Sequence, residues 1–131
     1  MPAEPRGTGR TIGYLLMGKT LKTRKTDDVV VIELFGRLMQ GAATLLLRET
    51  IRRHLLDGNR KFIIDVGAVS HIDSAGLGEM VAAYTTIRSG EGDVKLTRLT
   101  VRVKDLLQMT KLLTVFDCFD DEASAVAAFK D

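Results

Sequence analysis

Short apolar runs alternate along this chain with stretches in which apolar residues recur at helical spacing. Residues 29–35 form an almost continuous apolar run rich in β-branched side chains, which predicts a central strand covered on both faces and ended by Gly36. The more polar residues 19–25 predict an edge strand that joins it through a turn at 26–28. The two runs together predict an N-terminal β-hairpin.

The rest of the chain continues this alternation. Helical spacing predicts helices at 42–56, 77–87 and 103–110 and a last helix opened by 120–122, and the apolar runs predict strands at 61–66, 94–99 and 115–119. The side chains expected to face the core are Leu47, Ile51 and Leu55, then Leu77, Met80, Val81 and Tyr84, then Val103, Leu106, Leu107 and Thr110, and finally Ala123, Val126, Ala127 and Phe129. The order β-β-α-β-α-β-α-β-α predicts a single-domain α/β fold with a mixed, mainly parallel sheet and about four helices, because helical crossovers join parallel strands.

Length and charge place one domain after a short tail. The chain has 131 residues, enough for one hydrophobic core, and we expect a flexible tail at 1–16 and the folded domain at 17–131. The net charge is +2, but residues 1–26 hold six basic side chains and one acidic one, which leaves 13 basic and 16 acidic groups elsewhere. Since the domain itself is mildly acidic, no direct DNA binding is expected.

The sequence also predicts a cellular compartment. No apolar run approaches membrane-spanning length, so membrane insertion is not expected. The single cysteine, Cys118, has no second cysteine in the chain with which to form a disulfide, which indicates a reducing environment. These observations predict a cytoplasmic protein.

Catalytic and cofactor motifs fail at identifiable positions. A dinucleotide fingerprint starting at Gly76 would need a glycine where Val81 stands, and a nucleophile elbow around Ser74 would need a glycine where Ile72 stands. We therefore expect no enzyme activity and no bound cofactor.

The remaining polar residues have structural interpretations. His71 is expected to point away from Ser74 toward solvent or a local carbonyl, and His54 to complement the negative end of the first helix. Asp65 is interpreted as a hydrogen-bond acceptor at a strand end, and Cys118 with scattered acids makes no metal-binding set. No metal site is predicted.

Residues 69–79, V-S-H-I-D-S-A-G-L-G-E, are the most informative segment. They place Asp73 and Ser74 where a buried strand gives way to a helix, so that Ser74 lies near backbone N–H groups without helical partners. These groups and the helix dipole accommodate a phosphate at low structural cost, which makes Ser74 a candidate phospho-acceptor. The alternative is that Asp73 and Ser74 only cap the helix, worth about 1 kcal/mol, while Gly76 and Gly78 permit close helix–sheet approach.

This motif and the element order resemble the STAS domain, most closely the bacterial anti-sigma factor antagonists. The resemblance runs from Lys19 to Phe129 and is carried by residues 29–38 with Gly36-Arg37-Leu38, residues 62–65, Ile72-Asp73-Ser74-Ala75-Gly76-Leu77-Gly78, residues 103–110, Val115-Phe116 and residues 121–129. The central motif together with the element order is specific to the family, whereas each piece alone is common.

The resemblance implies a regulatory switch. In that family the serine after the aspartate is phosphorylated by a GHKL-type anti-sigma serine kinase and dephosphorylated by a PP2C-like phosphatase, which corresponds here to Ser74. The unphosphorylated form binds the anti-sigma factor and releases a sigma factor. The partner-binding residues implied here are Asp73, Ala75, Gly76, Leu77 and Gly78, with Met39 and Gln40 in a loop where relatives often carry an aspartate. Many relatives carry a second hydroxyl where Ala75 stands, so Ser74 is the only acceptor in the motif.

Two other roles stay open on the sequence alone. One is an accessory subunit of a membrane transporter, such as a lipid-transport ATPase, since the basic residues 19–25 suit a surface near anionic lipid. The other is a scaffold component of a signalling assembly, which would be marked by stable self-association.

Overall fold

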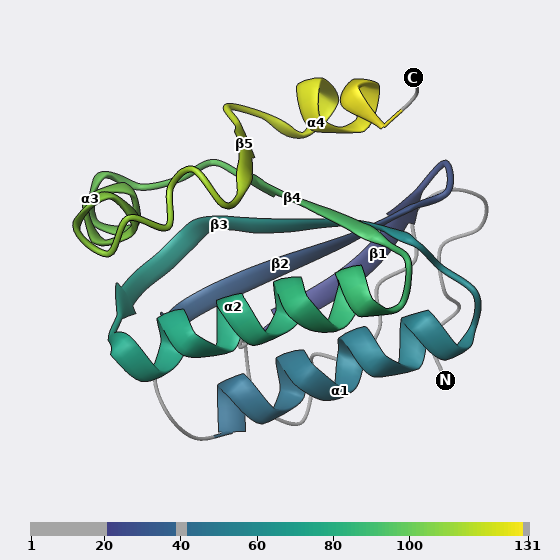
Figure 1. Cartoon of the computed structure of the whole chain (residues 1–131), viewed down its shortest axis with the longest axis horizontal. Helices are drawn as coiled ribbons and strands as arrows, with labels where there is room; N and C mark the ends of the chain where they lie inside the picture. The colour runs from purple at the N-terminus through teal and green to yellow at the C-terminus, as the bar shows by residue number, and fades with distance from the viewer. Residues whose placement is uncertain (1–20, 39–41, 130–131) are drawn as a thin grey trace, which may run out of the picture.

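The computed structural model describes residues 21–38 and 42–129, which form one five-stranded sheet with four helices (Figure 1). The elements are β1 (Leu21–Thr26), β2 (Val29–Leu38), α1 (Ala42–Leu56), β3 (Lys61–Ile72), α2 (Ser74–Ser89), β4 (Asp93–Thr97), α3 (Val101–Met109), β5 (Asp117–Phe119) and α4 (Glu122–Ala128). The predicted element order is confirmed. The predicted tail at 1–16, Lys19, Met39 and Gln40 lie outside the described residues.

The strands lie in the order β1-β2-β3-β4-β5, with β1 antiparallel to β2 and every other pair parallel. The predicted mixed, mainly parallel sheet with an N-terminal hairpin is therefore confirmed. Helices α1 and α2 lie side by side against one face of the sheet, and α4 lies on the opposite side (Figure 1). Crossover helices between β2, β3 and β4 bring the carboxyl ends of these strands to one edge.

Alternate residues of the central strands enter two separate cores. In β2 and β3, Ile32 and Ile64 face the larger core under α1 and α2, where Leu47, Ile51, Met80 and Ile87 are fully buried. On the other face Val31 and Ile63 pack with Ala125 of α4 in a smaller cluster. Burial on both faces explains why these strands are nearly continuous apolar runs.

The two central strands are longer than predicted. Gly36 does not end β2: it adopts a φ of +72°, and the strand continues to Leu38 through a register irregularity. β3 extends to Ile72, because Gly36 pairs with Val69 and Leu38 with Ile72. The predicted strand at 61–66 is therefore too short, because residues 67–72 continue it to the Ser74 motif.

The C-terminal elements differ in detail from their predictions. α4 begins after the capping residue Asp121, and the side of the helix that faces the sheet buries Ala125. Ala123 and Ala127 are exposed, so their predicted core positions are wrong. Thr110 is exposed as the C-cap of α3 rather than packed in the core. Because β5 begins only at residue 117, the predicted strand from residue 115 is too long.

Candidate functional site

Asp73 is the residue that caps α2. It has an extended backbone, with φ −116° and ψ −174°, and its Oδ1 accepts a hydrogen bond from the Gly76 N–H at 2.8 Å. The Leu77 N–H donates the first helical bond to the Asp73 carbonyl at 2.9 Å. The capping role that the sequence offered for Asp73 and Ser74 together therefore belongs to Asp73 alone.

Ser74 occupies the first position of α2 and is exposed. Its hydroxyl makes no hydrogen bond within residues 21–38 and 42–129. Since Asp73 performs the capping, the Ser74 hydroxyl is available to a second protein without loss of the cap.

The other predicted contact residues of the motif divide between surface and interior. Gly78 is exposed, and a Cβ added to it meets no atom within 4 Å, so close helix–sheet approach does not explain this glycine. Gly76 and Leu77 are buried, and Ala75 is half-buried. Ser74 and Gly78 are thus the most exposed members, and the partner-binding role of the set stays a prediction.

The end of β2 lies beside this motif. Leu38 pairs with Ile72, the residue before the cap, so the chain leaves β2 at the sheet edge where α2 begins. Met39 and Gln40 come directly after Leu38 but lie outside the described residues. Their predicted contact with a partner stays a prediction.

The two acidic side chains nearest to Ser74 in the sequence, Asp73 and Glu79, already have partners within the domain. Glu79, one turn into α2, pairs with Arg48 of α1 and so ties the two helices together. The first turn of α2 holds no acidic side chain, and Asp73 uses its carboxylate for the cap. A phosphate on Ser74 would therefore meet the helix N-terminus on one side and the Asp73 carboxylate on the other.

Neither histidine forms a hydrogen bond with Ser74 in the described part of the chain. His71 is exposed in β3, and its Nδ1 lies 3.1 Å from the Ser70 hydroxyl rather than near a carbonyl. His54 is buried, its Nδ1 lies 3.3 Å from the Asn59 amide nitrogen, and its Nε2 has no hydrogen-bond partner in the described part of the chain. His54 lies in the last turn of α1, as predicted, but burial lowers its pKa, which opposes the predicted charge complement to the helix end.

Asp65 is a hydrogen-bond acceptor, as predicted, but lies inside β3 rather than at its end. Its Oδ1 accepts from the Gly67 N–H at 2.9 Å, and the Nε of Arg98 donates to both carboxylate oxygens. The sequence analysis did not identify Arg98, which leaves β4 with a φ of +57° and lies 33 residues away along the chain. Its pairing with Asp65 carried no local sequence signal.

Ligand-type features are sparse in the described ranges. No group of three or more His, Cys, Asp and Glu residues among residues 21–38 and 42–129 could hold a metal ion. Burial raises the pKa of the Cys118 thiol, so this cysteine stays protonated at neutral pH. Within the same residues, none of the helices has the length and apolar character needed to cross a bilayer.

Comparisons with known proteins place this geometry in context. The STAS domain family model matches residues 20–125. BtrV of Bordetella bronchiseptica, assigned as an anti-sigma factor antagonist, is 26% identical over 106 residues, which span 81% of this chain and 90% of BtrV. A crystal structure from Thermotoga maritima, also assigned as an anti-sigma factor antagonist, is 25% identical with a TM-score of 0.76, over 83% of this chain and 93% of its own.

Two structures of a further relative share the fold. The anti-sigma factor antagonist SpoIIAA in its unphosphorylated form has a TM-score of 0.64 at 20% identity, over 83% of this chain and 96% of its own. The phosphorylated form of SpoIIAA, a Bacillus cell fate determinant, has a TM-score of 0.67 at 21% identity, over 84% of this chain and 99% of its own. The described chain therefore has the same architecture as a protein solved in both phosphorylation states.

Proposed function

This chain belongs to the STAS domain family, and we propose that it is an anti-sigma factor antagonist controlled by phosphorylation of Ser74. In its unphosphorylated form the protein binds an anti-sigma factor of the GHKL serine-kinase class, and the sigma factor held by that partner is released. Phosphorylation dissociates the complex, and a PP2C-like phosphatase restores the binding form. The protein is a cytoplasmic regulator rather than an enzyme.

The observation that carries this proposal is the division of roles between Asp73 and Ser74. The carboxylate of Asp73 accepts the Gly76 N–H and holds the start of α2. Ser74 is exposed at the next position, with a hydroxyl that α2 does not need. A residue with this environment can change its charge while the helix keeps its cap.

The transfer step requires only an accessible hydroxyl on this chain. The Ser74 oxygen attacks the γ-phosphorus of ATP bound to the kinase, the bond to ADP breaks, and the hydroxyl proton passes to a base of the kinase. This chain supplies the nucleophile and the partner supplies nucleotide and base. That division fits a chain whose histidines lie elsewhere.

Electrostatic repulsion explains why phosphorylation should weaken, rather than strengthen, binding to the partner. Phosphorylation adds about −1.5 to −2 charges at neutral pH next to the Asp73 carboxylate. At a docked surface this charge brings repulsion, bulk and a desolvation cost, and a tenfold loss of affinity needs only about 1.4 kcal/mol. SpoIIAA, solved in unphosphorylated and phosphorylated forms, supports a switch that leaves the fold intact.

Phosphorylation by a purified kinase tests this proposal. Wild-type protein, Ser74→Ala and Ser70→Ala are incubated with ATP and each GHKL-type serine kinase encoded in the same genome, and the intact masses are measured. Ser70 is an appropriate control because it is a second exposed serine four residues away. We expect one phosphoryl group on wild type and on Ser70→Ala, and none on Ser74→Ala.

Two results would count against it. A phosphoryl group on Ser74→Ala would place the modification elsewhere. Unmodified wild-type protein that binds none of these kinases, and instead purifies with subunits of a membrane transporter, would replace the proposed role with the accessory-subunit role.

A further inference from the structure

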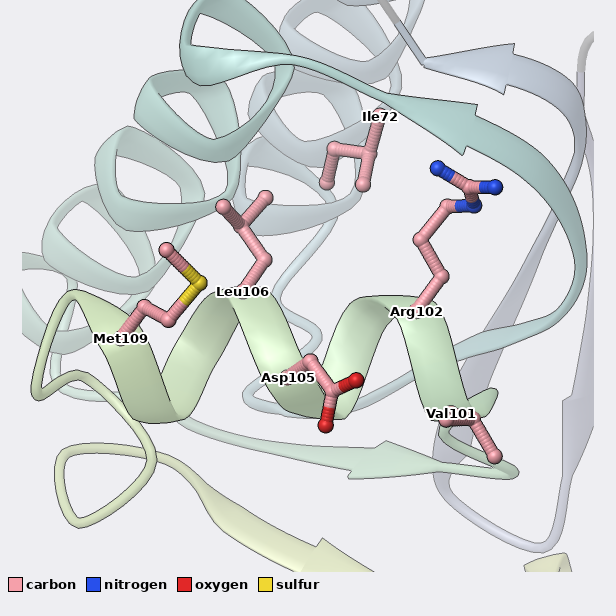
Figure 2. A pocket seen from close by; sticks show the side chains of 6 residues that line it. All are labelled: Ile72, Val101, Arg102, Asp105, Leu106 and Met109. Atoms are coloured by element: carbon pink, nitrogen blue, oxygen red, sulfur yellow. The ribbon is translucent and has the colours of Figure 1, made fainter.

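A pocket lies between the end of β3 and the outer side of α3 (Figure 2). It is lined by Ile72, Val101, Arg102, Asp105, Leu106 and Met109. In Figure 2 the Leu106 side chain points from α3 toward Ile72, with Arg102 and Met109 on either side. Because Ile72 is the last residue of β3, the pocket begins two residues before Ser74.

The apolar residues of this surface are unusually exposed. Val101 and Met109, at the two ends of α3, are 78% and 79% exposed. The helix buries only Val103 and Leu107 in the core, and Leu106 is half-buried at its edge. Most of α3 therefore faces outward, and two of its outward-facing side chains, Val101 and Met109, are apolar and not covered by the described residues.

The charged residues of the pocket also lack partners in the described chain. Arg102 and Asp105 are exposed and form no ion pair or hydrogen bond with residues 21–38 or 42–129, although many other charged side chains of the domain are paired. Protein interfaces are enriched in methionine and arginine, and arginine is frequent among the residues that dominate binding energy. The combination of apolar side chains and an unpaired guanidinium is typical of a docking surface.

We propose that this pocket and the outer side of α3 form the second half of the surface that docks the anti-sigma factor. The partner inserts an apolar side chain between Ile72 and Leu106 and covers Met109, and it offers a carboxylate to Arg102. The inference rests on the proposed function, since the occupant is the partner that Ser74 regulates. The argument for that occupant is continuity, because Ile72 lines the pocket and leads directly into the Asp73–Ser74 turn.

This placement would let a single phosphate on Ser74 weaken binding at the pocket as well. A partner that carries a carboxylate for Arg102 is acidic close to the site where phosphorylation adds negative charge. The phosphate then repels the same element that fills the pocket. Neither effect requires α3 to move.

Binding of three variants tests the proposal, with the GHKL-type anti-sigma factor that binds the wild-type protein as the probe. Met109→Glu places a charge on the apolar side of the surface, and Arg102→Glu reverses the charge at its rim. Leu56→Glu is the matched control, because Leu56 is 81% exposed and ends α1 at the other end of the sheet from α3 (Figure 1). All three positions are exposed, so thermal unfolding should match the wild type.

We expect isothermal titration to give a Kd at least tenfold higher for Met109→Glu and for Arg102→Glu, and a Kd within twofold of wild type for Leu56→Glu. Wild-type affinity in both α3 variants, together with weak binding of Ser74→Asp, would overturn the docking surface and leave the proposed function standing. If the wild-type protein binds no such anti-sigma factor, the proposed function fails and this inference fails with it.

Discussion

The Nε of Arg98 donates to both carboxylate oxygens of Asp65, at 3.0 Å each. Asp65 lies inside β3 with its side chain only 10% exposed, and its Oδ1 also accepts the Gly67 N–H where β3 shifts register against β2. The hydrogen bond that Arg98 donates to Asp65 raises the pKa of the guanidinium, which therefore stays charged. The pair thus joins the residue after β4 to the half of β3 that leads to Ser74 at the start of α2.

Removal of Arg98 should therefore destabilise the domain. In Arg98→Ala the buried carboxylate keeps only the Gly67 N–H, and we expect the free energy of unfolding to fall by about 1 to 2 kcal/mol. This is less than for a fully buried pair, because the Arg98 side chain is 48% exposed. Urea denaturation measures the change. Arg88→Ala, which removes an exposed ion pair with Asp93, is the control and should change it by less than about 0.5 kcal/mol.

A side chain at Gly67 should disturb the same pair. A Cβ at this position would lie 2.5 Å from the Arg98 Cζ, so Gly67→Ala must displace the guanidinium from Asp65. We expect the free energy of unfolding to fall by about as much as in Arg98→Ala. Because both changes break the same pair, the double variant should be as stable as the less stable of the two single variants. Additive losses in urea denaturation would show that the two residues act separately.

Gly78 is a contrasting position, because a Cβ added there meets no atom within 4 Å. Gly78→Ala should therefore stabilise α2 by about 0.5 to 1 kcal/mol.

Asp73 offers a test of the cap at the proposed switch. Asp73→Ala leaves the Gly76 N–H without its acceptor and should lower the free energy of unfolding by about 1 kcal/mol. Asp73→Asn keeps a capping oxygen and should lie within about 0.5 kcal/mol of wild type. Thermal or urea denaturation distinguishes the two. Equal stability of Asp73→Ala and wild type would mean that α2 does not depend on this cap.

His54 should make stability depend on pH. Burial lowers its pKa below the ordinary 6.5, so protons bind the unfolded chain more readily than the folded one. The stability that the neutral His54 ring contributes to the folded state is fully present above pH 6.5. It is lost as the pH falls through the lower pKa of the folded state. In urea denaturation His54→Gln should flatten the decline below pH 6.5, whereas His71→Gln should retain it. An unchanged decline in His54→Gln would assign the effect to other groups.

The regular alternation of elements was predictable because it depends on apolar spacing alone. The pattern could not show that β2 and β3 continue past Gly36, since the extension depends on pairing between Leu38 and Ile72 across the sheet. Helical spacing placed the start of the second helix at Leu77, because the preceding turn is stabilised by the Asp73 cap rather than by apolar contacts.

The candidate site was predictable only in its local part. The Asp73–Ser74 motif is contiguous, so its residue types and order indicated a helix start, which the structure has at Ser74. The phospho-acceptor role of Ser74 stays a prediction. The surface of α3 was missed because Val101 and Met109 fall outside the core-facing positions that helical spacing selects. Whether such residues gather beside Ile72 depends on how α3 lies against the end of β3, which no local pattern encodes.

The most direct test of the central claim compares the affinity of the anti-sigma factor for the unphosphorylated protein and for the protein phosphorylated on Ser74. Isothermal titration should give a Kd at least tenfold higher for the phosphorylated form, equivalent to about 1.4 kcal/mol. Ser74→Asp should bind weakly in the same way and Ser74→Ala as tightly as wild type, with unfolding temperatures nearly unchanged. Equal affinities for the two forms would contradict a switch at Ser74.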